Sequence, residues 1–427
     1  MSTLKAVRGT RDLLPPETAL WNRIEATARS VFSRYNFGEI RTPVFEDTAL
    51  FSRGVGEETD IVSKEMYTWE DRARAQSEKT QTLTLRPENT AGVVRAYIEH
   101  GLGESGQLQK LYYIGPQFRR ERPQKGRYRQ FSQIGAEVIG PTSAGSESPL
   151  RDAEVLEMLA TLLDELGIAG WTLHLNSVGS AADRARYNQT LREALVPLAP
   201  QMCADCQRRA ETNPLRVLDC KVPADQPLID TLPVIADSLD EASKAHFAAV
   251  KAALDAAGVP YTLNPRLVRG LDYYTRTTFE FTHGGLGAQN ALLGGGRYDG
   301  LSEMIGGPKA PGIGFAMGED RLVLTLLALD QNSAPPQADA YIAPLGESMN
   351  AAALALAREL RHAGVHVELG DGSFRLKKSF ESGNKTARKI VILGEDELDS
   401  GILTVKDFSS GVQTKVPRAE LAGFLQN

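Results

Sequence analysis

Several features that would assign a protein class at once are scarce or missing from this sequence. Only three cysteines occur in 427 residues, which indicates a reducing compartment rather than a disulfide-bonded secreted chain. No apolar run approaches the length of a membrane span, and the first five residues lack the apolar core of a signal peptide. We therefore expect a cytoplasmic protein that makes no membrane contact.

Signatures of the common catalytic machineries are also missing. The sequence has no Ser-His-Asp spacing, no metalloprotease helix and no P-loop. The formal net charge of −6 argues against a protein coated with cations for non-specific nucleic-acid binding. A chain of this length exceeds a single hydrophobic core, so we expect two or three domains.

Positive charge is instead concentrated in two short segments. The first is a predicted hairpin, in which the apolar run 111–114 enters and the alternating run Gln130–Ile139 leaves. Its loop sets six cations against the single acid Glu121: Arg119, Arg120, Arg122, Lys125, Arg127 and Arg129. The second segment, 375–389, contains six more: Arg375, Lys377, Lys378, Lys385, Arg388 and Lys389. We expect these patches to contact two distant parts of one long polyanion.

The return strand of the hairpin predicts the floor of a pocket. Alternation along a strand assigns one set of side chains to the core: Ile134, Ala136 and Val138. The opposite face carries a carboxamide, a gap and a carboxylate: Gln133, Gly135 and Glu137. Glycine within a strand often marks the close approach of a ligand. The alternative is a solvated sheet face beside a basic loop.

Candidate site residues are cations and polar groups, without a nucleophile paired to a base. They include Arg119, Arg269, Arg321, Glu88, Gln133, Glu137 and Tyr274. Chemistry that needs cations but no covalent enzyme intermediate is displacement at phosphorus. There the protein positions the reactants and neutralises charge, often with Mg²⁺. The sequence therefore predicts this class of reaction.

Three local features bear on this prediction. Arg321 falls in the first turn of a predicted helix, where the helix dipole disfavours a cation, so an anion-binding role is favoured. The run Gly294–Gly296 lets something flat lie against bare backbone, although glycine runs are usually turns. Glu88 precedes a helix that we expect Thr90 to cap and that runs to about His100. It is either an acid favoured by the helix dipole or the holder of a substrate ammonium.

The element pattern predicts two domains. Residues 1–330 mix strands and helices on a mainly antiparallel sheet, an α+β arrangement interrupted by a helical insertion at about 179–260. Residues 39–46 are expected to form one strand, with Pro43 at an edge or bulge. A linker near Ser333 leads to a small α/β domain at 337–427.

All three cysteines, Cys203, Cys206 and Cys220, lie in the predicted insertion. A zinc site needs a fourth ligand, and the nearest histidines, His174 and His246, are far away in sequence. The alternative, which this spacing favours, is a set of partly buried reduced thiols. We therefore predict no metal site.

At this point the motifs resemble a known family. Residues 118–131 resemble the second signature of class II aminoacyl-tRNA synthetases, residues 38–46 the first, and residues 312–322 the third. The blocks 269–274 and 294–301 are similar to two that are peculiar to histidyl-tRNA synthetases. Together with the start of the chain and the C-terminal domain, the resemblance covers nearly the whole sequence.

The resemblance implies a histidine–tRNA ligase. Such an enzyme activates L-histidine with ATP to histidyl-adenylate and pyrophosphate, and then transfers histidine to the 3′-terminal adenosine of tRNA(His). It also implies a homodimer with an active site in each half, a class II catalytic domain and an anticodon-binding domain from about residue 337. ATP is then a substrate, accompanied by Mg²⁺.

The resemblance also implies residue roles. Arg119 would bind the α-phosphate of ATP, Arg321 the γ-phosphate, and Arg269 would neutralise charge as the carboxylate attacks, with Glu121 also at the nucleotide. Histidine would be held by six residues: Glu88, Thr90, Gln133, Glu137, Tyr273 and Tyr274. Contacts to tRNA would come from Gln124, Arg127, Lys377, Lys378 and Lys385.

Two alternatives stay open. A paralogue of these enzymes is the regulatory subunit of ATP phosphoribosyltransferase, which senses histidine without charging tRNA. Such paralogues generally lack the anticodon domain and parts of the catalytic blocks, whereas this sequence has Arg269 and a C-terminal domain. The other alternative is a class II synthetase for a different amino acid.

Overall fold

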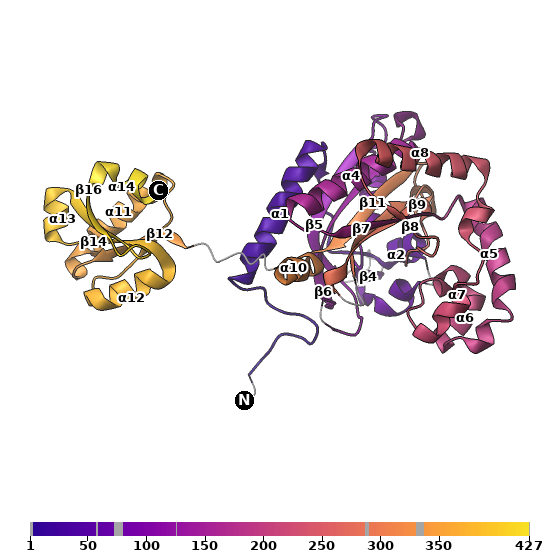
Figure 1. Cartoon of the computed structure of the whole chain (residues 1–427), viewed down its shortest axis with the longest axis horizontal. Helices are drawn as coiled ribbons and strands as arrows, with labels where there is room; N and C mark the ends of the chain where they lie inside the picture. Colours follow the sequence, from indigo (N-terminus) through magenta and orange to yellow (C-terminus); the bar gives the residue numbers. More distant parts are fainter. Residues whose placement is uncertain are drawn as a thin grey trace. The chain divides into compact units, whose positions relative to one another are not determined.

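The computed structural model describes residues 3–56, 59–71, 80–124, 126–286, 290–329 and 337–426. The chain divides into two compact units, residues 1–333 and 334–427 (Figure 1). The boundary between them, with the expected linker, lies outside the described residues, as does Lys125.

The first unit is built on an eight-stranded sheet. Its strands, in spatial order, are β1 (Gly38–Glu39), β5 (Gln109–Phe118), β6 (Gln130–Ile139), β11 (Gly312–Gly318), β10 (Ala291–Arg297), β9 (Thr275–His283), β7 (Trp171–Ser177) and β8 (Thr262–Leu263). All neighbours from β5 to β7 pair antiparallel, and only the short edge strands β1 and β8 pair parallel. The expected mainly antiparallel sheet is confirmed, and β6 has the predicted bounds.

Helices cover one face of this sheet. Four of them contribute to its main core: α1 (Glu17–Arg34), α4 (Pro149–Glu165), α8 (Glu241–Ala257) and α10 (Glu319–Ala328). The expected inward face of β6, with Ile134, Ala136 and Val138, is buried against them. Three shorter helices belong to the other side: α2 (Thr48–Val55), α3 (Thr90–Glu99) and α9 (Leu301–Met304).

The expected strand 39–46 is wrong in one respect. Its two ends belong to different sheets, because Pro43 lies between β1 and β2 and has no amide hydrogen to donate to a ladder. A second sheet has the order β2 (Phe45–Asp47), β4 (Gln81–Leu85) and β3 (Tyr67–Asp71). A π-helical turn, η1 (Ile61–Glu65), precedes β3.

The helical insertion has a hydrophobic core of its own. It contains α5 (Ala181–Leu195), α6 (Ala204–Thr212), α7 (Gln226–Ile229) and the 3-10 turns η3 (Ala199–Gln201), η4 (Pro214–Val217), η5 (Pro223–Asp225) and η6 (Ile235–Ser238). That core reaches from Val178 to Leu239 and includes Val268. Helix α8 instead packs on α4, and its Val250 and Leu254 join the main core. The separate helical core thus ends before α8.

The second unit is a five-stranded mixed sheet with helices. Its strands, in spatial order, are β13 (Val367–Leu369), β12 (Ala338–Pro344), β14 (Ala387–Leu393), β15 (Ile402–Asp407) and β16 (Gln413–Pro417). Its helices are α11 (Asn350–His362), α12 (Leu376–Thr386), α13 (Glu395–Ser400) and α14 (Leu421–Gln426). The parallel strands β13, β12 and β14 and the final hairpin confirm the α/β expectation.

Candidate active site

A cavity of about 960 Å³ opens within the first unit, on the sheet face opposite α1 and α4. Most of the predicted site residues of this unit line it: Glu88, Thr90, Arg119, Glu121, Arg127, Gln133, Arg269, Tyr273, Tyr274 and Arg321. Two of them, Gln124 and Glu137, are absent from its lining. The sheet therefore brings together cations and polar groups that are more than 200 residues apart in sequence.

Arg269 lies against the backbone of the glycine run on β10. A Cβ atom at Gly294 would be 2.6 Å from the guanidinium carbon of Arg269, so the flat group that lies on this backbone is the chain's own side chain. Arg269 Nη1 donates to Glu280 Oε2 at 2.6 Å, and Glu280 pairs with Gly294 across the strands. Burial lowers the pKa of Arg269 and Glu280 raises it, with a net rise. The result is a fixed cation on the cavity floor.

Two further arginines are oriented by backbone carbonyls. Arg119 Nε donates to the carbonyl oxygen of Pro87 at 2.9 Å, and its guanidinium lies 5.3 Å from the ring centre of Phe131. Arg321 Nη1 donates to the carbonyl oxygen of Ala291 at 2.7 Å. Burial and then the nearby cation Arg127 lower the pKa of Arg321. A bound anion would relieve that unfavourable environment, as the sequence predicted for Arg321.

The start of α3 differs from the expectation. Thr90 is its first residue and not its cap, because the carboxylate of Glu88 accepts the amide hydrogens of Thr90 and Ala91 at 2.7 and 3.1 Å. The helix-stabilising role of Glu88 is therefore confirmed, and the role of holding a substrate ammonium stays a prediction. Burial raises the pKa of Glu88, which also lines the cavity.

Glu137 lies behind the cavity wall and is fully buried. Its carboxylate accepts hydrogen bonds from the hydroxyls of Thr90 and Tyr298, each at 2.7 Å. It occupies space that a side chain at Gly314, its neighbour on β11, would fill. Burial raises the pKa of Glu137 to about 8, although both hydrogen bonds lower it. Of the two polar side chains that were expected on the cavity floor, Gln133 therefore lines the cavity and Glu137 does not.

The gap at Gly135 is filled by Tyr113, which sequence reasoning missed. The two residues pair across β5 and β6, and a Cβ atom at Gly135 would overlap the tyrosine ring. The register of the hairpin was the available signal. Among the described residues, the hydroxyl of Tyr113 and the Oε1 atom of Gln133 are buried without a hydrogen-bond partner. Both residues line the cavity.

The basic hairpin loop is partly engaged with the rest of the chain. Arg127 pairs with Glu121 at 3.1 Å and forms a backbone bridge with Gln124. Arg129 donates a side-chain hydrogen bond to the carbonyl oxygen of Arg8 at 3.2 Å. The guanidinium of Arg120 lies 5.9 Å from the ring centre of Tyr67.

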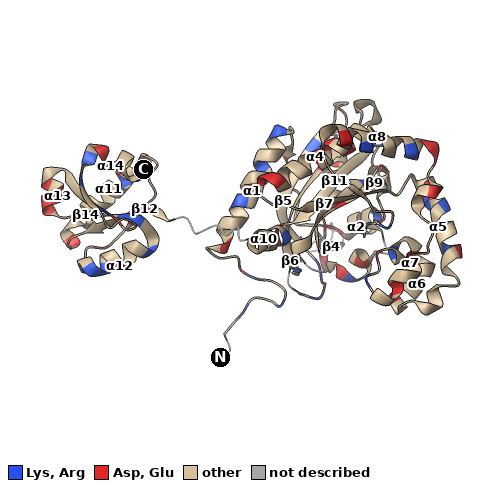
Figure 2. Ribbon diagram, in the orientation of Figure 1, with Lys and Arg blue, Asp and Glu red and all other residues tan. Residues whose placement is uncertain are grey.

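The second basic patch is smaller than expected. Arg375 is exposed at the start of α12, and Lys377, Lys378 and Lys385 are exposed on this helix, where Figure 2 shows positive residues. Arg388 instead pairs with Asp339 at 2.6 Å. Lys389 is buried and donates to the carbonyl oxygen of Phe424 at 3.2 Å, because it follows the inward alternation of β14.

The antiparallel sheet, with anchored arginines on its open face, defines the catalytic domain of a class II aminoacyl-tRNA synthetase. A family model described as histidyl-tRNA synthetase matches residues 9–322, and a model of an anticodon binding domain matches residues 339–427. The chain belongs to the histidyl-tRNA synthetase family.

Several known proteins are similar to this chain over nearly its whole length. A histidine–tRNA ligase of Koribacter versatilis is 72% identical over 425 residues, which is 99% of this chain and 96% of that protein. A histidine–tRNA ligase of Solibacter usitatus is 56% identical over 424 residues, 99% of each. The crystal structure of apo histidyl-tRNA synthetase from S. aureus has a TM-score of 0.81 and 36% identity, with full coverage of both chains.

The family membership settles the two alternatives. The chain is an ATP-dependent ligase that charges tRNA with histidine, and its second unit is an anticodon-binding domain. The interpretations as a histidine-sensing regulator or as a synthetase for another amino acid are therefore set aside.

None of the described helices is both long and apolar enough to cross a membrane.

Proposed function

We propose that the cavity carries out both half-reactions of histidine charging. In the first, a carboxylate oxygen of histidine attacks the α-phosphorus of ATP and pyrophosphate leaves. In the second, a hydroxyl of the 3′-terminal adenosine attacks the carbonyl carbon of histidyl-adenylate and AMP leaves. The observation that carries the proposal is that Arg119, Arg269 and Arg321 line one cavity together with Glu88 and Gln133.

The nucleotide is held by the two arginines that lie on backbone carbonyls. The family resemblance assigns Arg119 to the α-phosphate and Arg321 to the γ-phosphate. Each guanidinium is oriented by a backbone carbonyl yet keeps further N–H donors for phosphate oxygens, which supports both assignments. Mg²⁺ enters with ATP as part of the substrate. Two carboxylates of the cavity wall, Glu65 and Glu121, fit such an ion, since hard oxygen ligands suit it. Burial raises the pKa of Glu65, while Arg119 lowers it and Glu121 raises it, so a cation between the two acids would be favourable.

Arg269 is the catalytic cation in this proposal. Its position on Gly294 and its pairing with Glu280 fix a positive charge before the reaction begins. A fixed cation stabilises the negative charge that develops as the carboxylate attacks phosphorus, without reorganisation at that moment. Arg119 supports the same charge from the α-phosphate side.

Histidine binds in the part of the cavity that is lined by Glu88, Gln133, Tyr273 and Tyr274. The buried acceptors Glu88 and Gln133 Oε1 suit the α-ammonium, while Tyr273 and Tyr274 lie beside the ring. We infer that Glu137 reaches the imidazole only when the Thr90 hydroxyl gives up its hydrogen bond to that carboxylate. A pocket that bonds both ring nitrogens rejects isosteres through unpaired buried polar groups.

Contacts to tRNA come from both units. Gln124 and Arg127 in the hairpin loop contact the acceptor end, while Lys377, Lys378 and Lys385 contact phosphates near the anticodon. The exposure of the three lysines supports this assignment. We further propose that the enzyme is a homodimer and acts in the cytoplasm.

The test is histidine-dependent exchange between ATP and pyrophosphate with the purified chain, in the parent and in Glu137→Ala. The parent is expected to exchange with histidine and with no other amino acid. Glu137→Ala should raise the KM for histidine by at least about tenfold, the effect of one lost buried hydrogen bond to a charged group, and leave the KM for ATP within about twofold. An equal rise in the KM values for histidine and for ATP would show that Glu137 does not contact histidine. Exchange with a different amino acid would overturn the proposed specificity.

A further inference from the structure

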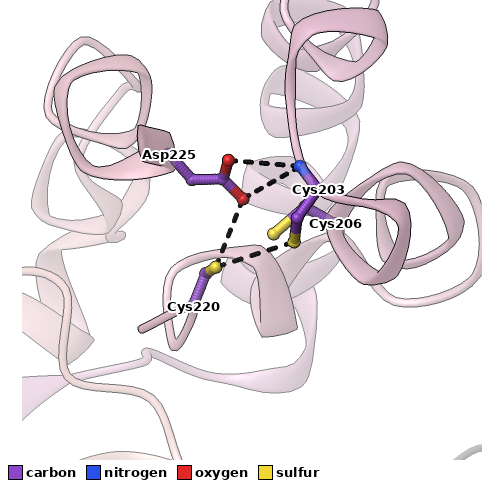
Figure 3. A group of neighbouring side chains, drawn as sticks. All are labelled: Cys203, Cys206, Cys220 and Asp225. Carbon is purple, nitrogen blue, oxygen red and sulfur yellow. Dashed lines mark hydrogen bonds between the residues drawn. The ribbon is translucent and has the colours of Figure 1, made fainter. Parts of the chain in front are cut away.

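Three thiols and one carboxylate of the helical insertion converge on a common centre. Cys203 caps α6 and Cys206 lies in its first turn, whereas Cys220 follows η4 and Asp225 ends η5. Figure 3 shows the four side chains directed toward one another from these separate segments. One possible ligand atom from each residue can be chosen so that all four lie within 4.8 Å of one another.

The distances suit a tetrahedral metal ion better than a disulfide. The sulfur atoms of Cys203 and Cys220 are 4.0 Å apart, and the sulfur of Cys220 lies 3.3 Å from Asp225 Oδ2. Zinc ligands at their usual bond lengths are roughly 3.5–3.8 Å apart around a tetrahedron. A disulfide would require about 2.05 Å between the sulfur atoms. All three cysteines are free.

Burial of the cluster also favours a cation. Cys206, Cys220 and Asp225 are at most 5% exposed. Asp225 receives hydrogen bonds from the amide of Cys203 and the thiol of Cys220, and no lysine or arginine among the described residues pairs with it. A buried carboxylate without a cation is costly, and a bound metal removes that cost.

We propose that Cys203, Cys206, Cys220 and Asp225 bind one zinc ion as a closed structural site. Three thiolates and one carboxylate complete the tetrahedral shell, which leaves no position for a substrate. The sequence alone favoured free thiols because no histidine lies near the three cysteines to act as a fourth ligand. In the structure the fourth ligand is a carboxylate, Asp225, shortly after Cys220.

The site has the surroundings of a metal centre and a clear structural task. The amide of Val222 donates to the sulfur of Cys220 at 3.4 Å, a contact that orients a thiolate ligand. The ion would fasten the start of α6 to the η4–η5 segment, within a small core of the kind that often needs a metal. Cys220, Arg216 and Asp219 also line the active-site cavity, so the ion would fix the wall that faces Arg269.

Metal content of the full-length chain tests the proposal. The parent, purified without a metal-affinity tag and dialysed, is expected to contain about one zinc per chain by mass spectrometry. Replacement by cobalt should give visible bands of tetrahedral cobalt and near-ultraviolet thiolate-to-metal charge transfer. Asp225→Ala should weaken zinc binding by at least the ~10–100-fold that loss of an outer-shell partner costs. Asp205→Asn is the matched control, since its carboxylate lies between the first two cysteines in sequence but is 70% exposed.

A second variant separates metal loss from misfolding. Asp225→Cys should keep about one zinc per chain, because a thiolate replaces the carboxylate. The proposal is overturned if the parent carries no zinc, if it carries iron instead, or if cobalt gives no thiolate band. It is equally overturned if Asp225→Ala binds zinc as tightly as Asp205→Asn, or if alkylation of the denatured chain reveals a disulfide among the three cysteines.

Discussion

Two arginines at strand β10 of the catalytic unit have opposite surroundings. Arg297, on β10, is fully buried and donates to Asp152, Asp299 and the carbonyl oxygen of Ser146. Arg269 lies on the same strand's backbone, pairs with Glu280, and its Nε atom has no partner among the described residues. Of these two arginines, Arg269 lines the cavity and Arg297 does not.

The difference shows how one residue type serves two purposes. The guanidinium of Arg297 is satisfied by the protein and fastens β10 to α4 through Asp152. The guanidinium of Arg269 keeps hydrogen-bonding capacity and charge for a ligand. A buried cation that is fully bonded within the protein thus has a role in stability. A cation that faces a cavity and has donors left over indicates that a reactant of opposite charge binds there.

The largest effect is expected from removing the internal arginine. Arg297→Leu leaves Asp152 buried without its cation, which should lower the free energy of unfolding of the catalytic unit by about 3–5 kcal/mol. Thermal unfolding followed by circular dichroism measures the loss. The double variant Arg297→Leu/Asp152→Asn should recover part of it, because the fully buried carboxylate at position 152 is then replaced by a neutral amide. Unchanged stability of the single variant would mean that the network does not hold β10.

Removal of Arg269 should have the opposite effect, a large loss of activity with little loss of stability. Arg269→Ala is expected to lower the rate of adenylate formation by about 10²–10³-fold, the usual cost of one fixed donor at a developing charge. Histidine binding and thermal stability should stay close to those of the parent, since the side chain is not part of the core. Single-turnover kinetics and calorimetry with histidine measure the two effects. Parent-like exchange in this variant would refute its catalytic role.

Much of this arrangement was predictable from local sequence. The strict alternation from Gln130 to Ile139 fixed the bounds and the core face of β6. The glycine run correctly indicated a flat group on bare backbone. Arg321, whose place in the first helical turn suggested an anion-binding role, does line the cavity, and that role stays a prediction. In these cases the signal lies within one element.

The failures concern contacts made at a distance. Glu137 turns away from the cavity because Gly314, on a strand far along the chain, leaves room for it. Thr90 does not cap α3 because the carboxylate of Glu88 takes both amides. Lys389 belongs to a buried strand face although the residue before it, Arg388, is basic and exposed. Propensity and charge counts contain no information about such partners.

Glu137 and Glu319 predict a smaller, pH-dependent effect. Burial raises the pKa of Glu137 to about 8 from an ordinary value of 4.5, so the folded chain holds a proton that the unfolded chain loses above pH 4.5. Stability should therefore fall as pH rises from about 5 to 8, by up to about 1.4 kcal/mol per pH unit for this group. Glu137→Gln should flatten the slope. The variant should keep part of the pH dependence of stability below pH 7, because burial raises the pKa of Glu319 to about 7. Parallel curves for parent and variant, from chemical denaturation without ligands, would show that Glu137 is ionised when folded.

The smallest effects are expected on α12, where the same comparison applies to lysines. Lys377 and Lys385 are exposed, whereas the buried Lys389 bonds the last carbonyls of α14. Lys377→Gln and Lys385→Gln should each reduce the salt dependence of tRNA binding by about one counterion and change stability by less than about 0.5 kcal/mol. Lys389→Met should leave that salt dependence unchanged and destabilise the second unit by about 1 kcal/mol. Filter binding of tRNA over a range of salt concentrations decides the matter. If Lys389→Met changes the slope as much as Lys385→Gln does, the division between internal and ligand-directed cations fails in this unit.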